Sequence, residues 1–454
     1  MSSVDPRSAL AFRFISSSFD AATATVSLCY AFDDGDELVE RIVFTGAPAL
    51  APERTSAFAA ALRLLHLVAG VSYYKAGVPA QILIEAAPFD ADTAGFVEQV
   101  YQHGLAEFAY QNAFHDIGID LRERIRFPSV DTSPLAPAAS LGLPRRTLLP
   151  IGGGKDSLVS VERCRAIAEP ATAVWIGDSA LIAACAERTG LPQLNIRRML
   201  APGLFELNRT GAWNGHVPVT AINSVVLVCA AILYGYDAIA FSNERSASSA
   251  TLEYDGQEIN HQWSKGFAFE LRLRAYVHAH IAADLDYFSL LRPWSELAVA
   301  RAFARSSAYD DVFSSCNRNF RILGAHPTDR WCGKCPKCHF VFLALAPFVA
   351  KPRLLRIFGR NLLDDASLAP GFDALLEYRD HKPFECVGEG RESRAALFAL
   401  SERAEWREDA LVARFATQIL PQLVAGDAAI APLLAPAAEH CLPARFAAQL
   451  AAAG

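Results

Sequence analysis

The chain has 454 residues, of which 52% are hydrophobic, and its 42 basic and 49 acidic side chains give a net charge of −7. This composition excludes a disordered or collagen-like chain, because it supplies ample apolar material for hydrophobic cores. The acidic balance argues against a nucleic-acid partner and against an anionic membrane surface, since both require surplus positive charge. At about 150 residues per domain, the length favours about three domains.

The first residues and the cysteines favour a cytoplasmic location. The sequence MSSVDPRSALAFRF lacks the basic region and the long apolar region of a secretion signal. The longest apolar stretch, 225–236, is well short of the about 20 residues that a membrane span needs. Ten cysteines in a chain of this length are too sparse for a secreted disulfide scaffold. We therefore expect free thiols and no membrane association.

Residues 1–127 are predicted to form an N-terminal α+β domain. Polar and apolar side chains alternate over 11–45 around a turn signal rich in Asp and Gly, which is typical of a β-hairpin. Two runs with helical periodicity follow, at 55–69 and 91–112. The next segment, 128–144, is rich in Pro, Ser and Ala and is predicted to be a linker.

Residues 145–310 show a different rhythm, in which strands alternate with helices of ten or more residues. Helices are predicted at 156–167, 220–234 and 267–282, and short apolar strands lie between them. Alternation of this kind favours an α/β fold with a doubly wound parallel sheet. Because right-handed crossovers bring the carboxyl ends of the strands to one edge, the loops that follow them are expected to meet there.

A glycine loop interrupts the sequence LLPIGGGKDSLVSV between the first of these strands and its helix. Three glycines allow the backbone N–H groups to converge on an anion, and the helix N-terminus adds the positive end of its dipole. The acidic residue in the loop suits a bound Mg²⁺ or a helix cap. The spacing is neither that of a Walker A loop nor that of a dinucleotide fingerprint. The candidate anion-binding residues are Gly152, Gly153, Gly154, Lys155, Asp156 and Ser157.

This glycine loop resembles the PP-loop, S-G-G-x-D-S, of the ATP pyrophosphatases, with Gly152 in place of the first serine. The resemblance implies a sheet of the adenine nucleotide alpha hydrolase-like type. It also implies that ATP, with Mg²⁺, is cleaved between its α- and β-phosphates to activate a substrate oxygen as an adenylate. Asp178, Asn243 and Glu244 follow later strands and become candidate nucleotide contacts, although turn chemistry alone could explain them.

Two further segments are dense in reactive side chains. The first, 260–270, contains His261, Trp263 and Lys265 immediately before a predicted helix. These side chains could bind a carboxylate or phosphate and stack on a base or sugar. The second segment, 378–388, is of the same kind. A solvated loop is the alternative for each.

A cysteine cluster follows, with the pattern C-x15-C-x2-C-x2-C. Zinc prefers four soft ligands in a tetrahedron, and closely spaced cysteines supply them, so structural Zn²⁺ is the first interpretation. In a second interpretation the thiols are catalytic, because neighbouring lysines would lower their pKa values and allow them to move protons. Unliganded thiols on a loop are the third. The four cysteines are Cys316, Cys332, Cys335 and Cys338.

Segments across most of the chain are similar to the MurL family of ATP-dependent epimerases, which act on UDP-N-acetylmuramoyl-L-alanyl-L-glutamate in peptidoglycan precursor synthesis. They are FRFISSSFD, the glycine loop, NGHVPVTAINS, FSNERSAS, NHQWSKGFAFE, WCGKCPKCHFVFLALAPF and KPFECVG. The resemblance implies that ATP yields AMP and pyrophosphate and that an acyl-adenylate forms. It further implies that the terminal L-Glu of UDP-MurNAc-L-Ala-L-Glu is inverted to D-Glu.

Inversion requires proton removal on one face of the carbon and proton delivery on the other, hence two acid–base groups. If zinc takes all four cysteines, His261 and Lys265 become the better candidates. The runner-up function keeps the chemistry but changes the acceptor, as in a PP-loop ATP-dependent ligase or nucleobase-modifying enzyme with a zinc lobe. A nucleotide-binding scaffold without turnover is a third possibility. The catalytic candidates are Lys155, Asp156, Lys265, His261, Cys335 and Cys338.

The remaining chain is assigned by composition. Residues 311–390 are expected to form a Cys-rich lobe around the cysteine cluster. Residues 391–454 are rich in Ala, which favours helix, and are expected to form a helical C-terminal region. The sequence does not indicate an oligomeric state.

Overall fold

The computed structural model describes residues 5–129, 137–320, 327, 329–379, 381–424, 426 and 428–451. Nine strands form its central sheet. They are β1 (Ala11–Asp20), β2 (Thr25–Phe32), β3 (Leu38–Phe44), β4 (Gln81–Ile84), β5 (Thr147–Pro150), β6 (Ala171–Ile176), β7 (Gln193–Met199), β8 (Ala238–Phe241) and β11 (Asp286–Ser289). A separate hairpin consists of β9 (Leu252–Tyr254) and β10 (Gln257–Ile259).

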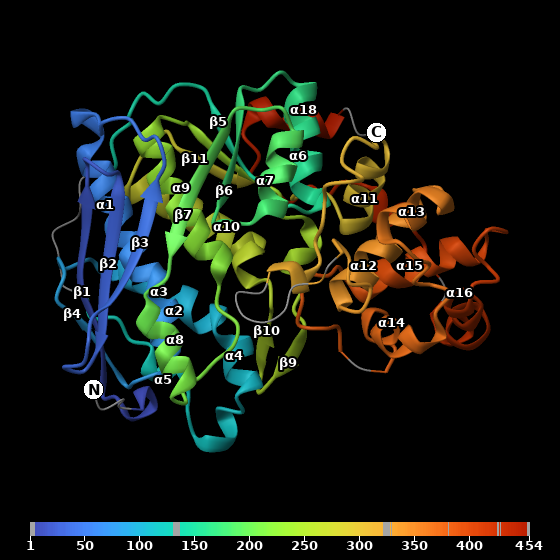
Figure 1. The fold of residues 1–454 in the computed structure, drawn as a ribbon, viewed down its shortest axis with the longest axis horizontal. Coiled ribbons are helices and arrows are strands. Elements are labelled where there is room, and N and C mark those ends of the chain that lie inside the picture. The colour runs from blue at the N-terminus through green and yellow to red at the C-terminus, as the bar shows by residue number, and fades with distance from the viewer. Residues whose placement is uncertain are drawn as a thin grey trace.

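The nine strands lie in the order β11-β8-β5-β6-β7-β3-β2-β1-β4 (Figure 1). The five strands from β11 to β7 pair in parallel, which confirms the α/β fold with a mostly parallel sheet predicted for this part of the chain. Chain order reverses between β5 and β8, because β6 follows β5 on one side and β8 flanks it on the other. In open α/β sheets, ligands bind at such a switch point, outside the carboxyl ends of the strands.

Helices cover both faces of the parallel strands. One face carries α6 (Lys155–Ala166), α7 (Ala180–Arg188) and α11 (Glu296–Ala304), and the other carries α1 (Thr55–Ala69), α9 (Val219–Tyr234) and α10 (Phe267–His280). The remaining α-helices are α2 (Val71–Tyr74), α3 (Ala91–Gly104), α4 (Ala106–Gln111), α5 (Leu121–Arg124), α8 (Pro202–Arg209), α12 (Pro336–Leu345), α13 (Lys351–Phe358), α14 (Ala369–Leu375), α15 (Gly390–Ser401), α16 (Ala410–Arg414), α17 (Ala431–Leu434) and α18 (Ala444–Ala451).

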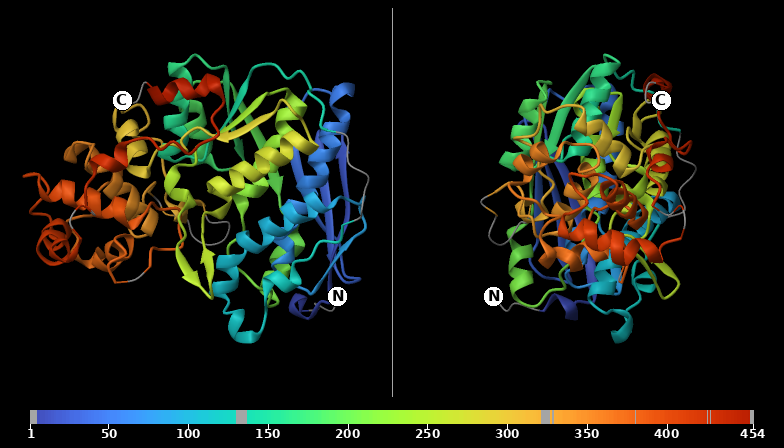
Figure 2. Two further views of the ribbon diagram at one scale, coloured as in Figure 1. Left: turned by 180° about the vertical axis from the view of Figure 1, so that it is seen from behind. Right: turned by 90° about the vertical axis from the view of Figure 1, so that its right-hand side faces the viewer.

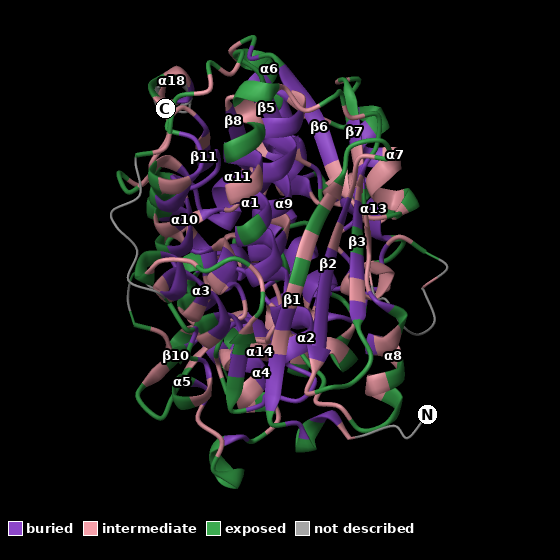
Figure 3. Cartoon of the chain, turned by 90° about the vertical axis from the view of Figure 1, so that its left-hand side faces the viewer, coloured by how far each residue is buried: buried purple, intermediate pink, exposed green. Residues whose placement is uncertain are grey.

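The side chains of the parallel strands divide between two hydrophobic cores. Leu148 and Ile239 belong to the core that contains α1 and α9, whereas their neighbours Leu149 and Ala240 belong to the core that contains α6 and α11. Successive side chains of a strand point to opposite faces, so strands covered on both faces are apolar throughout. By contrast, residues 15–20 of β1 alternate between half-buried and exposed (Figure 3), as in a strand with one face toward a core and one toward solvent.

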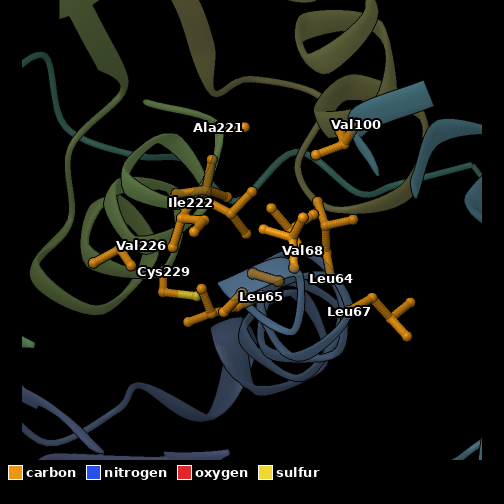
Figure 4. Packing of buried hydrophobic residues seen from close by; sticks show 14 of the residues in the cluster. Leu64, Leu65, Leu67, Val68, Val100, Ala221, Ile222, Val226 and Cys229 are labelled. Atoms are coloured by element: carbon orange, nitrogen blue, oxygen red, sulfur yellow. The ribbon is translucent and has the colours of Figure 1, made fainter. Parts of the chain in front are cut away.

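Helices α1 and α9 pack closely on each other (Figure 4). Leu65 and Val68 of α1 meet Ile222 and Cys229 of α9. The sequence of α9 is apolar on all sides because the helix is buried along almost its whole length. Within the described residues, the run Pro52–Tyr74 is long and apolar enough to cross a membrane by length and composition. However, 72% of its most apolar window is buried inside the fold, as in a core helix.

The sheet does not stop at the predicted linker. Strand β3 pairs antiparallel with β7, with Phe44 opposite Ile196, so the N-terminal strands continue the parallel part of the sheet. The core that contains α1 extends from β1 to β11 and is shared by the segments predicted as residues 1–127 and 145–310. Part of the predicted linker lies outside the described residues.

A helical lobe, α12 to α16, packs beside α11 and forms one end of the molecule (Figure 1). The C-terminal region is helical, as its composition indicates, but it is divided into short pieces. It also leaves the lobe and returns to the sheet, where α18 lies (Figure 2). There Phe446 is buried, with its ring centroid 4.7 Å from that of Phe288, and Arg445 forms a 2.6 Å ion pair with Asp237.

Candidate functional site

The loops after the parallel strands meet at one edge of the sheet, as predicted. The glycine loop follows β5, and Asn243 and Glu244 follow β8. Glu296 begins α11, shortly after β11. The glycine loop and Glu244 therefore follow the two strands that flank the switch point, β5 and β8.

The glycine loop depends on glycine mainly through the backbone conformation at Gly153. Gly153 has φ = +82°, a left-handed conformation that favours glycine. A Cβ atom on Gly154 would lie 2.5 Å from the Oγ of Ser315, so a side chain at this position would require the Ser315 hydroxyl to rotate away. Gly154 is the N-cap of α6 and provides no side-chain cap, which leaves the first N–H groups of the helix available to an anion. The Ser157 hydroxyl donates to the Gly154 carbonyl at 3.1 Å.

Lys155 is fully buried beneath this loop. Its Nζ lies 2.5 Å from the Asp156 carboxylate and also contacts Glu296. Burial lowers the pKa of Lys155, but these two carboxylates raise it by more, so the side chain remains charged. Burial likewise raises the pKa of Asp156, yet the nearby ammonium groups of Lys155 and Lys337 bring it below its usual value.

Glu244 completes a group of three acidic side chains with Asp156 and Glu296. It is buried, and burial together with the charges of Glu296 and Asp156 raises its pKa to about 8. Burial is the largest cause of this shift, and the charge of Arg292 opposes it. Carboxylate oxygens are the ligands that Mg²⁺ prefers, but among the described residues these three are not one of the groups whose ligand atoms lie within 4.8 Å of one another.

The other two predicted nucleotide contacts differ from each other. Asn243 is half-buried, and its backbone N–H donates to the Ser289 hydroxyl at 2.6 Å, which ties the end of β8 to the end of β11. Asp178 follows β6 but is exposed, and its carboxylate lies 3.5 Å from Nε of Arg197.

A second polar group surrounds Lys265. Its Nζ donates to the Sγ of Cys386 at 3.0 Å. His261 interacts electrostatically with the same thiol, and its Nδ1 lies 2.5 Å from a carboxylate oxygen of Glu107. The ring of His216 lies 4.4 Å from that of His261. Of these side chains the sequence pointed to His261 and Lys265, whereas Cys386 was only one member of the polar run 378–388.

The pKa values in this second group are strongly perturbed. Burial raises the pKa of Cys386, but the charges of Lys265 and His261 bring it well below its usual value. Burial lowers the pKa of His261, yet its interactions with Cys386 and Glu107 raise it to about 9. Burial and the charge of His261 lower the pKa of His216 to about 3. The group therefore consists of alternating charges: carboxylate, imidazolium, thiolate and ammonium.

Lys337, on α12, connects the two groups. Its Nζ lies 3.7 Å from Glu296, the partner of Lys155, and it also donates to the backbone carbonyl of Cys386. The predicted residues Lys155, Asp156, Lys265 and His261 thus belong to one polar region between the edge of the sheet and the lobe. Sequence reasoning missed Glu296 and Glu107, because each is an ordinary acidic residue in a helical run.

The four clustered cysteines form a compact site beside the glycine loop. Their sulfur atoms all lie within 4.8 Å of one another. Three pairs are 4.0, 3.8 and 3.4 Å apart, close to the about 3.8 Å edge of a tetrahedron with 2.3 Å zinc–sulfur bonds. The arrangement therefore fits zinc. Backbone N–H of Ser314 donates to Gly153 at 2.9 Å, which links this cluster to the loop.

Comparison with known proteins bears on the whole chain. The family model described as the MurL N-terminal domain matches residues 3–290, and the MurL C-terminal domain matches residues 312–429. The chain belongs to the MurL family. The N-terminal MurL match thus extends through β11, the last strand of the nine-stranded sheet, and the C-terminal match begins just before the cysteine cluster. The resemblance seen in the sequence is confirmed.

Three relatives resemble this MurL chain over nearly its full length, and each is described as a UDP-N-acetyl-alpha-D-muramoyl-L-alanyl-L-glutamate epimerase. A protein of Xanthomonas oryzae pv. oryzae (strain MAFF 311018) is 59% identical over 98% of this chain and 97% of its own length. A Salinispora tropica protein is 43% identical over 96% of this chain and 94% of its own length. A Micromonospora protein is 42% identical over 97% of this chain and 98% of its own length.

Proposed function

We propose that this protein is an ATP-dependent epimerase that converts the terminal L-Glu of UDP-MurNAc-L-Ala-L-Glu to D-Glu. In this proposal an acyl-adenylate forms and AMP and pyrophosphate are released. The relatives support the substrate and the inversion by their descriptions. The observation that carries the proposal is the buried chain of contacts from Lys155 through Glu296 and Lys337 to Cys386, because it joins a phosphate-binding type of loop to a group of acid–base side chains.

Adenylation explains why ATP is required. A Cα–H next to an ionised carboxylate is very weakly acidic, since its removal would add negative charge to an anion. Joining that carboxylate to AMP masks its charge and makes the carbonyl a better acceptor of electrons. The glycine loop, as a PP-loop, holds the leaving pyrophosphate through the N–H groups at the start of α6. The buried ammonium of Lys155 stabilises the charge that develops there.

Mg²⁺ fits this proposal, with Asp156, Glu244 and Glu296 as the carboxylates nearest the loop. When bound, the ion supplies positive charge that neutralises phosphate oxygens. A cation bound there would lower the pKa of Glu244, which burial and the charges of Glu296 and Asp156 raise. The protein itself positions two of these carboxylates, Asp156 and Glu296, on the ammonium of Lys155.

Zinc in the cysteine cluster has a structural role in this proposal. It would fix Cys316, which follows the segment touching Gly153, to Cys335 and Cys338 at the start of α12. As ligands, Cys335 and Cys338 are not available as proton-transfer groups. The acid–base function therefore falls to the group around Lys265 and His261.

A cavity of about 1160 Å³ is the proposed place for the UDP-muramoyl part of the substrate; it is lined by Asn260 and Trp263, chain neighbours of His261, and not by His261, Lys265 or Cys386 themselves. Its wall includes Tyr110 and Arg122 from the N-terminal segment and Trp263, two residues from His261. The Tyr110 ring lies 5.6 Å from that of Phe384, which precedes Cys386 by two residues. The cavity exceeds the size of most small-molecule sites, as a nucleotide sugar with a dipeptide requires.

A direct assay tests the proposal. Purified protein is incubated with ATP, Mg²⁺ and UDP-MurNAc-L-Ala-L-Glu, and both pyrophosphate release and the configuration of the glutamate are measured. We expect pyrophosphate to appear with D-Glu. Pyrophosphate release with unchanged L-Glu would contradict the epimerase and favour a ligase.

A further inference from the structure

Cys386 lies at the end of the contact chain that runs from Lys155 through Glu296 and Lys337. We infer that Cys386 is one of the two acid–base residues of the epimerisation and acts at the substrate Cα as a thiolate. This inference rests on the proposed function and names a residue of the same site. It is carried by the side chains that surround the sulfur and by the contacts that fix the backbone on both sides of it.

Two cationic side chains face the Cys386 sulfur. Lys265 approaches it to 3.0 Å, and its own backbone carbonyl is held by the buried Arg292 at 2.6 Å. His261 approaches the thiol from the other polar segment and is oriented by Glu107. A cysteine, a histidine and a carboxylate in this sequence of contacts form the arrangement that activates thiols in enzymes.

The backbone of Cys386 is held as firmly as its side chain. Lys337 donates from its Nζ to the Cys386 carbonyl and from its backbone N–H to Glu385 at 2.9 Å. Gln262 donates to the carbonyl of Val387 at 3.2 Å. The segment 385–387 is therefore fixed on both sides of the thiol, and Cys386 remains half-buried rather than sealed off.

A metal ion is the other use to which Glu107, His216 and His261 could be put, and their distances speak against it. Two ligands of one zinc ion, each about 2.0–2.2 Å from the metal in a tetrahedron, lie about 3.3 Å apart. Glu107 and His261 are only 2.5 Å apart, which is a hydrogen bond. Glu107 therefore orients His261 toward Cys386.

Lys265 is a positioning residue and not the second base. The two bases of an epimerase lie on opposite sides of the reacting carbon, each within hydrogen-bond reach, and so are about 6 Å apart. The 3.0 Å contact between Lys265 and Cys386 leaves no room for a carbon between them. Lys265 therefore stabilises the thiolate.

The proton transfer balances as follows. The Cys386 thiolate takes the proton as the Cα–H bond of the acyl-adenylate breaks, and the electron pair moves into the adenylate carbonyl. Cα then takes a solvent-derived proton on its opposite face from a second acidic side chain. Water returns both groups to their starting protonation states. In D₂O the inverted product therefore carries deuterium at Cα.

The first test separates adenylation from proton transfer. In Cys386→Ser we expect substrate-dependent ATP–pyrophosphate exchange to stay within about threefold of wild type, while Cα deuterium incorporation falls at least about 100-fold. The matched control is Cys441→Ser, because Cys441 is also half-buried and its hydrogen bond to Glu270 survives in serine. Undiminished deuterium incorporation in Cys386→Ser, or an equal loss of both activities, would overturn the inference.

The second test measures alkylation of the thiols in the wild type and in one variant, and it needs no activity. Iodoacetamide at pH 7 should alkylate Cys386 at least about tenfold faster than Cys441, whose pKa is raised to about 12 by burial and by Glu270. Lys265→Met should slow alkylation of Cys386 and leave that of Cys441 unchanged. Equal rates at the two cysteines would overturn the inference. If the wild type releases no pyrophosphate, the proposed function fails, whereas the alkylation result still reports on the thiolate.

Discussion

Lys155 is the charged residue on which the proposed nucleotide chemistry depends most. Replacing it with Met removes the ammonium that faces Asp156 and Glu296. We expect pyrophosphate release to fall by about 10²–10³, the usual cost of losing one group that stabilises developing charge. Lys351→Met is the matched control, because it breaks an ion pair with Asp409 in the lobe. Unchanged pyrophosphate release in Lys155→Met would contradict the role of the loop.

Glu244 predicts a pH dependence of stability. Its pKa is raised to about 8 in the folded protein against 4.5 in the unfolded chain, so the folded state holds this proton more tightly. The resulting stabilisation is fully present below pH 4.5 and is lost as the pH rises through 8. In metal-free buffer, the free energy of unfolding of the wild type should therefore fall more steeply from pH 5 to 8 than that of Glu244→Gln.

Urea denaturation at several pH values measures this difference. Added Mg²⁺ should reduce it, because a cation near Glu244 favours the charged carboxylate. The same pH dependence in both proteins would show that Glu244 titrates normally.

At the scale of elements, the cysteine cluster connects the glycine loop to α12. Elemental analysis should find about one zinc per chain, and Cys335→Ser should lose it and unfold at lower temperature. The control is Cys29→Ser, a substitution in β2 at the other end of the sheet. Wild-type protein without zinc, at unchanged stability, would refute the structural site.

Local sequence patterns predicted the elements well. The periodic run at 55–69 corresponds to α1, and the predicted helices at 156–167, 220–234 and 267–282 correspond to α6, α9 and α10. Apolar periodicity is a property of each segment alone, and these helices bury one or more faces. The pairing of β3 with β7 was not predictable in this way, because it joins segments about 150 residues apart.

In the candidate site, too, residues in a local motif could be predicted, whereas contacts between distant segments could not. The glycines and Lys155 could be predicted from the sequence, because they are consecutive residues of one local motif. The contact between Lys265 and Cys386 joins residues 121 positions apart, and that between Glu107 and His261 joins residues 154 apart. Nothing in the local sequence distinguishes such a glutamate from a solvated one.

At the scale of the whole molecule, the C-terminal segment fastens the lobe to the sheet. Phe446 is fully buried against Phe288. Phe446→Ala should lower the free energy of unfolding by about 3–5 kcal/mol, as for other buried aromatic residues. Leu10→Ala is the control, because Leu10 is 73% exposed and its loss should cost no more than about 0.5 kcal/mol. Denaturant titration measures both, and equal stabilities would show that the segment is not anchored.

The antiparallel junction between β3 and β7 also limits how the chain can be divided. A fragment that began after the linker would carry the glycine loop, but β7 would become an edge with a bare row of N–H and C=O groups. Such an edge recruits strands from other molecules and promotes aggregation. A fragment that lacks the N-terminal strands is therefore expected to aggregate, so the N-terminal strands and the parallel strands must be kept together in one chain.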